Sequence, residues 1–252
     1  MAGAKRSEGL TNQVADNMQF RIISHEFSPG SFLPSERELQ AEYQVSRTVI
    51  REAIRLLVAR GLITTNSRQG NVVNTDNNAS LSEAMRLAFY RSNVYVEDIL
   101  STRLILEPSI VELAAQHASA TQIRDLLSLS DAFKNITVDP AQSNYVENRQ
   151  RWLENDRRFH ILLAEASQNP VLPILIEVTV GLLWHQSSLI TLSLSIEHHQ
   201  IVSRQHEAIA LAVQERHPAQ ARSAMLAHLE YTGSYLPRLR ERLLDLGVDV
   251  NP

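Results

Sequence analysis

The segment from Leu33 to Ile63, LPSERELQAEYQVSRTVIREAIRLLVARGLI, constrains the fold more than any other part of the sequence. It contains two helical patterns of apolar residues with a short polar turn between them. Ser35 and Glu38 have the spacing of a capping box, which marks the start of the first helix. Ser46 is a good N-cap for the second helix, and Gly61 follows its end. Two short helices joined by a tight turn predict a helix-turn-helix.

The residues on either side of this segment complete a predicted N-terminal domain. Apolar residues at helical spacing predict a helix over residues 11–24, and the SPGS stretch at 28–31 ends it. Residues 62–74 alternate β-branched and polar side chains around a turn that contains Gly70, which is typical of a β-hairpin. A helix-turn-helix followed by a hairpin is a winged helix-turn-helix, and we predict this fold for residues 1–74.

The rest of the chain shows helical patterns only. Residues 75–80 are polar and rich in Asn, so we predict a linker there and an all-α helical bundle over residues 81–252. Pro108 and Pro173 lie inside apolar helical patterns, where a kink or a helix boundary is expected. The predicted helices cover roughly 81–92, 96–118, 121–134, 142–167, 170–191, 196–216 and 218–243. The predicted fold class is therefore mainly α.

Composition restricts the chemistry and the location of the protein. The chain has no cysteine, which excludes disulfides and thiolate metal sites. No apolar run reaches the roughly 18 residues of a membrane span, and the N-terminus lacks the apolar stretch of a signal peptide. We therefore expect a cytoplasmic protein without a membrane partner. Residues 1–75 carry nine basic against seven acidic side chains, which indicates nucleic acid only weakly.

The placement of the arginines indicates DNA more strongly than their number. In a helix-turn-helix the N-terminal part of the second helix enters the major groove. Arg47 and Arg51 are four residues apart on one face of that helix, and arginine is the commonest reader of guanine. Ser46 and Thr48 can bond phosphates at the helix N-terminus. The alternative is a solvated pair of charged helices with ordinary ion pairs between neighbouring turns.

The opposite face of the second helix predicts the core of the domain. The apolar stripe that we expect to be buried consists of Ile50, Ile54, Leu57 and Val58. The predicted wing, with Arg68, Gln69 and Gly70, lies where it can reach the minor groove or the DNA backbone.

The motif PSEREL…VSRT.IREA…L…GLI resembles the N-terminal domain of the GntR family of bacterial transcription regulators, over roughly residues 11–74. The family often has a small hydroxyl residue where this chain has Val49, so one contact is expected to be apolar, for example to a thymine methyl group. The resemblance implies that Arg37 touches the DNA backbone, that Arg47 and Arg51 read bases, that Ser46 and Thr48 assist, and that Gly70 forms the wing tip.

A carboxylate and three histidines in the helical half suggest a metal site. Asp156 and His160 are four residues apart on one helical face, and His206 and His228 belong to two later predicted helices. Such ligands suit a divalent ion such as zinc, nickel or manganese, and a helical bundle can gather them in its core. A lone histidine is more often solvated or packed in the core than bound to a metal. That interpretation is kept for the other histidines, and His199 in particular is expected on the surface. These residues are His117, His185, His198, His199 and His217.

The segments RLILEPSIVELAA, DRRFHILLAEASQNPVL, QHEAIALAV and A..AMLAHL resemble the FCD ligand-binding domain, which accompanies one branch of GntR regulators. The resemblance covers roughly residues 95–235. It implies that Asp156, His160, His206 and His228 hold a divalent metal, zinc first and nickel or manganese next, at the floor of a pocket. Members of this branch that bind long-chain acyl groups lack this set, so an acyl thioester is not the expected effector.

Two further residues have two interpretations each. Arg103 has the spacing of an ordinary helix bridge with Glu107, whereas the resemblance implies that it binds a carboxylate effector. Asn169 precedes Pro170 as a helix cap would, whereas the resemblance implies a position near the effector.

The resemblance as a whole implies a transcription regulator and not an enzyme. We expect a homodimer that binds an inverted-repeat operator in double-stranded DNA, one half-site for each recognition helix. A small organic acid bound in the helical domain would modulate DNA binding, most commonly by releasing a repressor. The alternatives are a DNA-binding protein without an effector, and a metal-dependent hydrolase in which the ion activates water.

Overall fold

A computed structural model describes residues 2–66, 70–75, 84–85, 87–89, 91–92, 94–139, 141–190 and 195–235. The chain divides into two compact units, Met1–Ala84 and Met85–Pro252. Most of the predicted linker, residues 76–80, lies outside the described residues, so the predicted domain limits stay a prediction.

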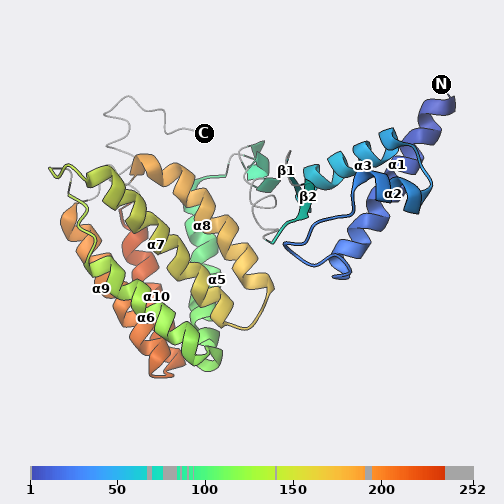
Figure 1. Cartoon of the computed structure of the whole chain (residues 1–252). Coiled ribbons are helices and arrows are strands. Elements are labelled where there is room, and N and C mark those ends of the chain that lie inside the picture. The colour runs from blue at the N-terminus through green and yellow to red at the C-terminus, as the bar shows by residue number, and fades with distance from the viewer. Residues whose placement is uncertain are drawn as a thin grey trace. The chain divides into compact units, whose positions relative to one another are not determined.

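The N-terminal unit contains the predicted helix-turn-helix and hairpin (Figure 1). Ser35 and Glu38 form the expected capping box, and the turn passes through Gln44 in the left-handed conformation, with a φ of 51°. Ser46 then caps the next helix by accepting from the backbone N–H of Val49. The elements are α1 (Ala2–Ile23), which begins well before the predicted residue 11, α2 (Glu36–Tyr43), α3 (Arg47–Ala59), β1 (Ile63–Asn66) and β2 (Gly70–Val73).

The wing has a contribution that the sequence analysis did not predict. Strands β1 and β2 pair antiparallel, with Ile63 opposite Val73. Residues 30–33, predicted only as the end of a helix and a loop, pair with the other edge of β2: Leu33 N–H donates to the Asn71 carbonyl at 2.8 Å. Gly30 has a φ of +79°, which lets the chain turn into this pairing. Arg68 and Gln69 lie outside the described residues.

Two predictions about α3 are wrong. Val49 is 5% exposed and belongs to the core of this unit, so it does not offer a methyl contact to a base. Val58 is 41% exposed, although it was predicted to be buried. At about 100° per residue, the buried stripe runs through Ile50, Ala53 and Leu57, and Val58 points away from its centre.

The helical unit confirms the predicted helices beyond residue 95, with ends that move by a few residues. Its elements are α5 (Val96–His117), α6 (Ala120–Lys134), α7 (Tyr145–Ala166), α8 (Val171–Ile190), α9 (Ile196–Gln214) and α10 (Pro218–Gly233). The predicted helix over 81–92 is helical at its described residues 84–85, 87–89 and 91, and the predicted extension of α10 beyond 235 lies outside the described residues.

The packing of this unit places α5 at its centre. Helix α5 packs against α7, α8, α9 and α10, and α6 packs against α7 and α9 (Figure 1). Pro108 is buried inside α5, which continues through it. The core includes the fully buried Phe133, Phe159 and Ile209, and it surrounds the polar group described below. Over the part of the chain that is described, no helix has both the length and the apolar character of a membrane span.

Candidate metal centre and DNA-binding surface

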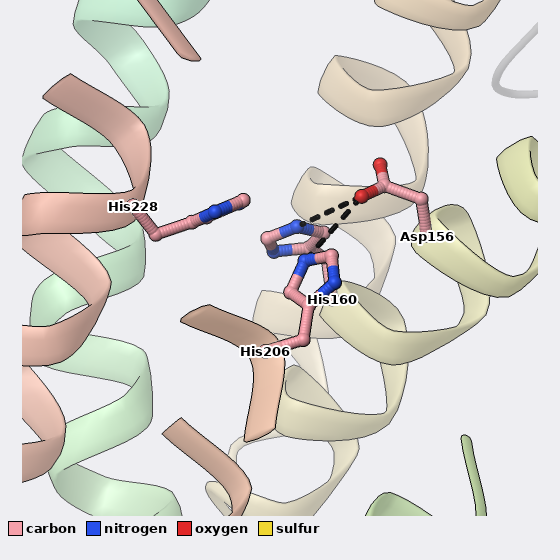
Figure 2. A group of neighbouring side chains, drawn as sticks. All are labelled: Asp156, His160, His206 and His228. Atoms are coloured by element: carbon pink, nitrogen blue, oxygen red, sulfur yellow. Dashed lines mark ion pairs between the residues drawn. The ribbon is translucent and has the colours of Figure 1, made fainter. Parts of the chain in front are cut away.

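Four of the predicted site residues converge in the middle of the helical unit. Asp156 and His160 project from α7, His206 from α9 and His228 from α10 (Figure 2). One ligand atom from each residue lies within 4.8 Å of the others. The three histidines are at most 2% exposed. The helix spacing places the first two together, and the packing of α9 and α10 brings the other two to them.

Several ring nitrogens of this group lack a hydrogen-bond partner among the described residues. Asp156 Oδ1 is 3.4 Å from His206 Nε2 and 3.8 Å from His160 Nε2, as the dashed lines in Figure 2 show. Nevertheless, His160 Nε2 and both ring nitrogens of His206 are buried without a hydrogen-bond partner among the described residues. Buried polar atoms of this kind carry a free-energy penalty. One oxygen and three nitrogen donors fit a zinc, nickel or manganese ion.

Two of the imidazoles are oriented by neighbouring side chains. His160 Nδ1 donates to Glu107 Oε2 at 2.5 Å, and His228 Nδ1 lies 3.2 Å from Gln205 Oε1. Both partners are acceptors at these oxygens, so each neutral ring carries its proton on Nδ1 and presents the lone pair of Nε2. Carboxylate or amide partners of this kind fix the ring orientation of metal-binding histidines.

Glu107 is the centre of a buried charged network. It bonds Arg103 on the same helix as well as His160, and both Arg103 and Glu107 are at most 3% exposed. Burial opposes ionisation of Glu107, but the charge of Arg103 and the interaction with His160 lower the pKa of Glu107 well below the ordinary value. Burial lowers the pKa of Arg103, and the charge of Glu107 more than compensates and raises it. Both groups are therefore charged at neutral pH.

Arg103 has a free donor in addition to this bridge. The structure shows the helix bridge to Glu107 that was one interpretation of Arg103. It also leaves Arg103 Nη2 buried and without a hydrogen-bond partner among the described residues. A guanidinium nitrogen in this state can donate to a carboxylate, which is the chemistry of the other interpretation.

The surroundings lower the pKa of two histidines of the group, His206 and His228, and so favour their neutral form. Burial is the largest cause that lowers the pKa of His206 and of His228, and the neighbouring imidazoles and Arg103 lower both further. Burial also raises the pKa of Asp156, while His160 and Arg103 oppose this. Only neutral imidazole binds a metal, so these shifts favour the binding form of the histidines. A divalent cation would in turn favour the ionised form of Asp156.

The sequence analysis did not find the roles of Glu107 and Gln205 toward the histidines. The sequence did contain one indication for Glu107, because it is a charged residue within the apolar stretch LILEPSIV. A buried charge needs more than one polar partner, so a second partner besides Arg103 could have been predicted. For Gln205 the sequence contained no such indication, because an amide beside His206 in the sequence does not indicate a bond to His228 on another helix.

At Asn169 the structure shows one of the two interpretations, and at His199 it corrects the prediction. Asn169 is exposed, and its Oδ1 accepts from the backbone N–H of Val171 at 3.1 Å, so the structure shows the helix cap at the start of α8. His199 is only 4% exposed, so its predicted place on the surface is wrong. Its burial follows from the packing of α9 against α6 and α10, which the helical pattern alone does not specify.

The residues predicted to contact DNA lie exposed on α2, at the start of α3 and on the wing. The side chains of Arg47 and Arg51 are 70% and 57% exposed. Arg37, Ser46 and Thr48 are also exposed, and Gly70 begins β2 with a φ of +101°. The Ser46 hydroxyl already accepts from Val49 N–H, so only its own proton is free for a phosphate.

Glu36 forms ion pairs with Arg47 and Arg51, contacts that the sequence alone did not predict. Its carboxylate lies 2.9 Å from Arg47 Nε and 3.7 Å from Arg51 Nε. Exposed pairs of this kind contribute little to stability. They can nevertheless restrict the directions in which both guanidinium groups point before DNA is bound.

Comparisons with known proteins agree with both halves of this description. Residues 10–73 match the family described as bacterial regulatory proteins, gntR family, and residues 98–231 match the FCD domain, which is known to bind metals. The chain is 30% identical over 223 residues to the HTH-type transcriptional repressor NanR of Cronobacter sakazakii, covering 87% of this chain and 82% of that protein. The same repressor from Escherichia coli K12 is also 30% identical, covering 87% of this chain and 81% of its own length.

A solved structure is similar over almost the same extent. The Streptococcus agalactiae GntR protein has a TM-score of 0.68 and 26% identity, and the match covers 88% of this chain and 98% of that one. The family and these relatives are transcription regulators. The chain therefore belongs to the GntR family of bacterial regulators, in the branch that carries an FCD domain, and it is a DNA-binding transcription regulator.

Proposed function

We propose that this protein is a metal-containing repressor that a small carboxylate metabolite releases from DNA. The observation that supports this most directly is the group formed by Asp156, His160, His206 and His228, with its unpartnered buried nitrogens. The name of the relatives, transcriptional repressor, supports repression as the direction of control.

The proposed DNA contacts use the exposed start of α3. In this proposal Arg47 and Arg51 bind base edges in the major groove, because their guanidinium groups are exposed on one face of the helix. In this proposal Arg37, Ser46 and Thr48 contact phosphates, and Gly70 on the wing approaches the DNA backbone. A homodimer would place two such helices on an inverted repeat.

The metal that the four residues would hold is zinc, with nickel and manganese as the alternatives. Zinc binds imidazole and carboxylate ligands with four-coordinate geometry, and a site can keep a further position for a ligand from solution. The ion would supply a Lewis acid that binds a carboxylate oxygen. Glu107 and Gln205 would hold His160 and His228 in the orientation for this ion.

The effector would be held by Arg103 as well as by the ion. Arg103 Nη2 is a buried donor without a hydrogen-bond partner among the described residues, and the charge of Arg103 influences the pKa of Asp156, His206 and His228. A carboxylate would satisfy this donor with a charge-assisted hydrogen bond. Effector binding changes DNA binding only if the effector has different affinities for the DNA-bound and the free arrangement of the dimer.

The test uses the zinc-loaded full-length protein and an operator selected from a random-sequence DNA pool. Fluorescence anisotropy would measure operator affinity while sugar acids, hydroxy acids, dicarboxylates and aromatic acids are added. We expect at least one acid to weaken operator binding by roughly 5- to 150-fold. We also expect chelation of the metal to abolish this response and leave operator binding in place.

Arg103→Lys is the variant for the effector contact. It keeps a positive charge beside Glu107 and removes the fork of donors, so the concentration of acid needed for release should rise about 10- to 100-fold. The matched control is Arg222→Lys, because Arg222 forms an exposed pair with Glu112 in the same unit. A protein that stays metal-free after reconstitution, or that responds to no acid with the metal present, would overturn the proposal.

A further inference from the structure

Trp152 and His199 form a buried pair of polar groups next to the candidate metal centre. Trp152 is 5% exposed and His199 is 4% exposed. Their rings meet edge to face, with centroids 4.9 Å apart. Trp152 Nε1 and His199 Nε2 are both buried, and neither has a hydrogen-bond partner among the described residues.

The chemistry of the two unpartnered atoms is complementary. An indole N–H can only donate. His199 Nδ1 lies 2.9 Å from the Ser195 carbonyl, which can only accept, so the proton of the neutral ring is on Nδ1. His199 Nε2 is consequently an acceptor. One donor and one acceptor, both unsatisfied and carried by two rings in contact, match a group that accepts one hydrogen bond and donates another, which is what a hydroxyl group does.

The pair lies in the next layer of the bundle above the metal group. Trp152 is four residues before Asp156 on α7, a rise of about 6 Å, and His199 is seven residues before His206 on α9, a rise of about 10 Å. At these spacings Trp152 and Asp156 lie on the same face of α7, and His199 and His206 lie on the same face of α9. Phe133 contacts both layers, with its ring centroid 5.5 Å from that of Trp152 and 4.4 Å from that of His206.

We propose that Trp152 Nε1 and His199 Nε2 form a hydroxyl-binding subsite, so that the effector is a hydroxylated carboxylic acid. This inference rests on the proposed function, because the carboxylate end of the effector is the part that the metal and Arg103 would hold. The hydroxyl group accepts from the Trp152 indole and donates to the His199 ring. The competing occupant is a permanently bound water molecule, which has the same hydrogen-bonding capacity.

The test compares gluconate with hexanoate, which have the same chain length and one carboxylate each but differ in hydroxyl groups. The zinc-loaded full chain would be labelled with ¹⁵N-tryptophan; the sequence has two tryptophans, Trp152 and Trp184, so two indole signals are expected. Trp152→Phe assigns them. We expect the Trp152 indole signal to shift with gluconate and not with hexanoate, while calorimetry records the binding of each acid.

His199→Asn is the variant that isolates the acceptor. The asparagine amide can still donate to the Ser195 carbonyl, as Nδ1 does, but no atom replaces Nε2. We expect the preference for gluconate over hexanoate to fall roughly fivefold to tenfold. Ser203→Ala is the control, because the Ser203 hydroxyl is buried on the same helix but already donates to the His199 carbonyl.

Three outcomes are informative in different ways. If both acids bind and the Trp152 signal responds equally to them or to neither, the occupant is water and the subsite is overturned. If His199→Asn keeps the full preference for gluconate, the acceptor assignment is overturned. If neither these nor the other acids of the panel bind to the zinc-loaded protein, the proposed function fails, and this inference fails with it.

Discussion

In the N-terminal unit the residues that we assign to function lie exposed on α3, whereas in the helical unit they lie buried among α5, α7, α9 and α10. Among the described residues, Arg47 and Arg51 form ion pairs with one half-buried acidic side chain, Glu36. Arg103, Glu107 and His160 form a continuous buried network. The first arrangement suits a large polyanion that approaches from solvent. The second suits a small ligand that must be surrounded.

This difference separates function from stability in one unit and joins them in the other. An exposed arginine can be removed without leaving an unsatisfied group inside the protein, so its loss should change DNA binding and little else. A buried histidine or carboxylate has partners that depend on it, so its loss should change ligand binding and folding together. The predictions below test this contrast.

The largest effect is expected from His206→Ala. Removing this ligand should lower metal affinity by more than about 100-fold. Even the loss of a residue that only hydrogen-bonds a metal ligand lowers metal affinity about 10- to 100-fold. Chelation should also destabilise the wild-type helical unit, by about 2.7 kcal/mol if the metal is present at 100 times its Kd. Elemental analysis and thermal unfolding measure both quantities. His117→Ala, at an exposed position of α5, is the control and should bind metal like the wild type.

The next effect is a loss of stability in acid. Burial, followed by the interaction with the neighbouring His199 ring, lowers the pKa of His198 to about 4, whereas the unfolded chain has an ordinary value near 6.5. Between these values the unfolded state binds a proton that the folded state does not. The free energy of unfolding should therefore decrease as pH falls from about 6.5 to about 4, with His198 contributing on the order of 2–3 kcal/mol.

Urea unfolding at several pH values measures this contribution. The pH dependence should be weaker in His198→Gln, which has no titrating group at this position. His217→Gln should keep the slope of the wild type, because the His217 side chain is 60% exposed. An unchanged slope in His198→Gln would mean that His198 does not titrate as a buried histidine.

Smaller effects are expected on DNA binding. Arg47→Ala and Arg51→Ala should each weaken binding to the selected operator by about 1–3 kcal/mol and leave the melting temperature of both units unchanged. Arg124→Ala, at an exposed position of α6, is the control. If both variants bound the operator as tightly as the wild type, the recognition surface would have to lie elsewhere.

The smallest effect tests whether the contrast extends to local structure. Ser35 and Ser119 both accept from the backbone N–H three residues on, in capping boxes of the two units. Ser35→Ala and Ser119→Ala should each destabilise their own unit by about 1 kcal/mol, because a cap acts only on its own helix. Unequal losses in chemical unfolding of the two units would show that these caps depend on tertiary contacts.

Apart from the start of α1 and the pairing of residues 30–33, the sequence determined the local structure of the described residues to within a few residues. The caps at Ser35 and Ser46, the turn at Gln44 and the hairpin before Val73 are all as predicted. The spacing of Asp156 and His160 also placed their side chains on one face of α7. Caps, turns and spacings depend on residues within one or two helical turns, and the chain contains that information directly.

Only the tertiary structure decided which of these faces are covered, and by what. Val49 is buried and Val58 exposed because α3 packs on α1, and residues 30–33 join the wing because β2 has a free edge. Glu107 meets His160 across 53 residues of sequence, and Gln205 meets His228 across 23. Contacts between helices depend on how the helices pack, and helical spacing within one helix does not specify that packing.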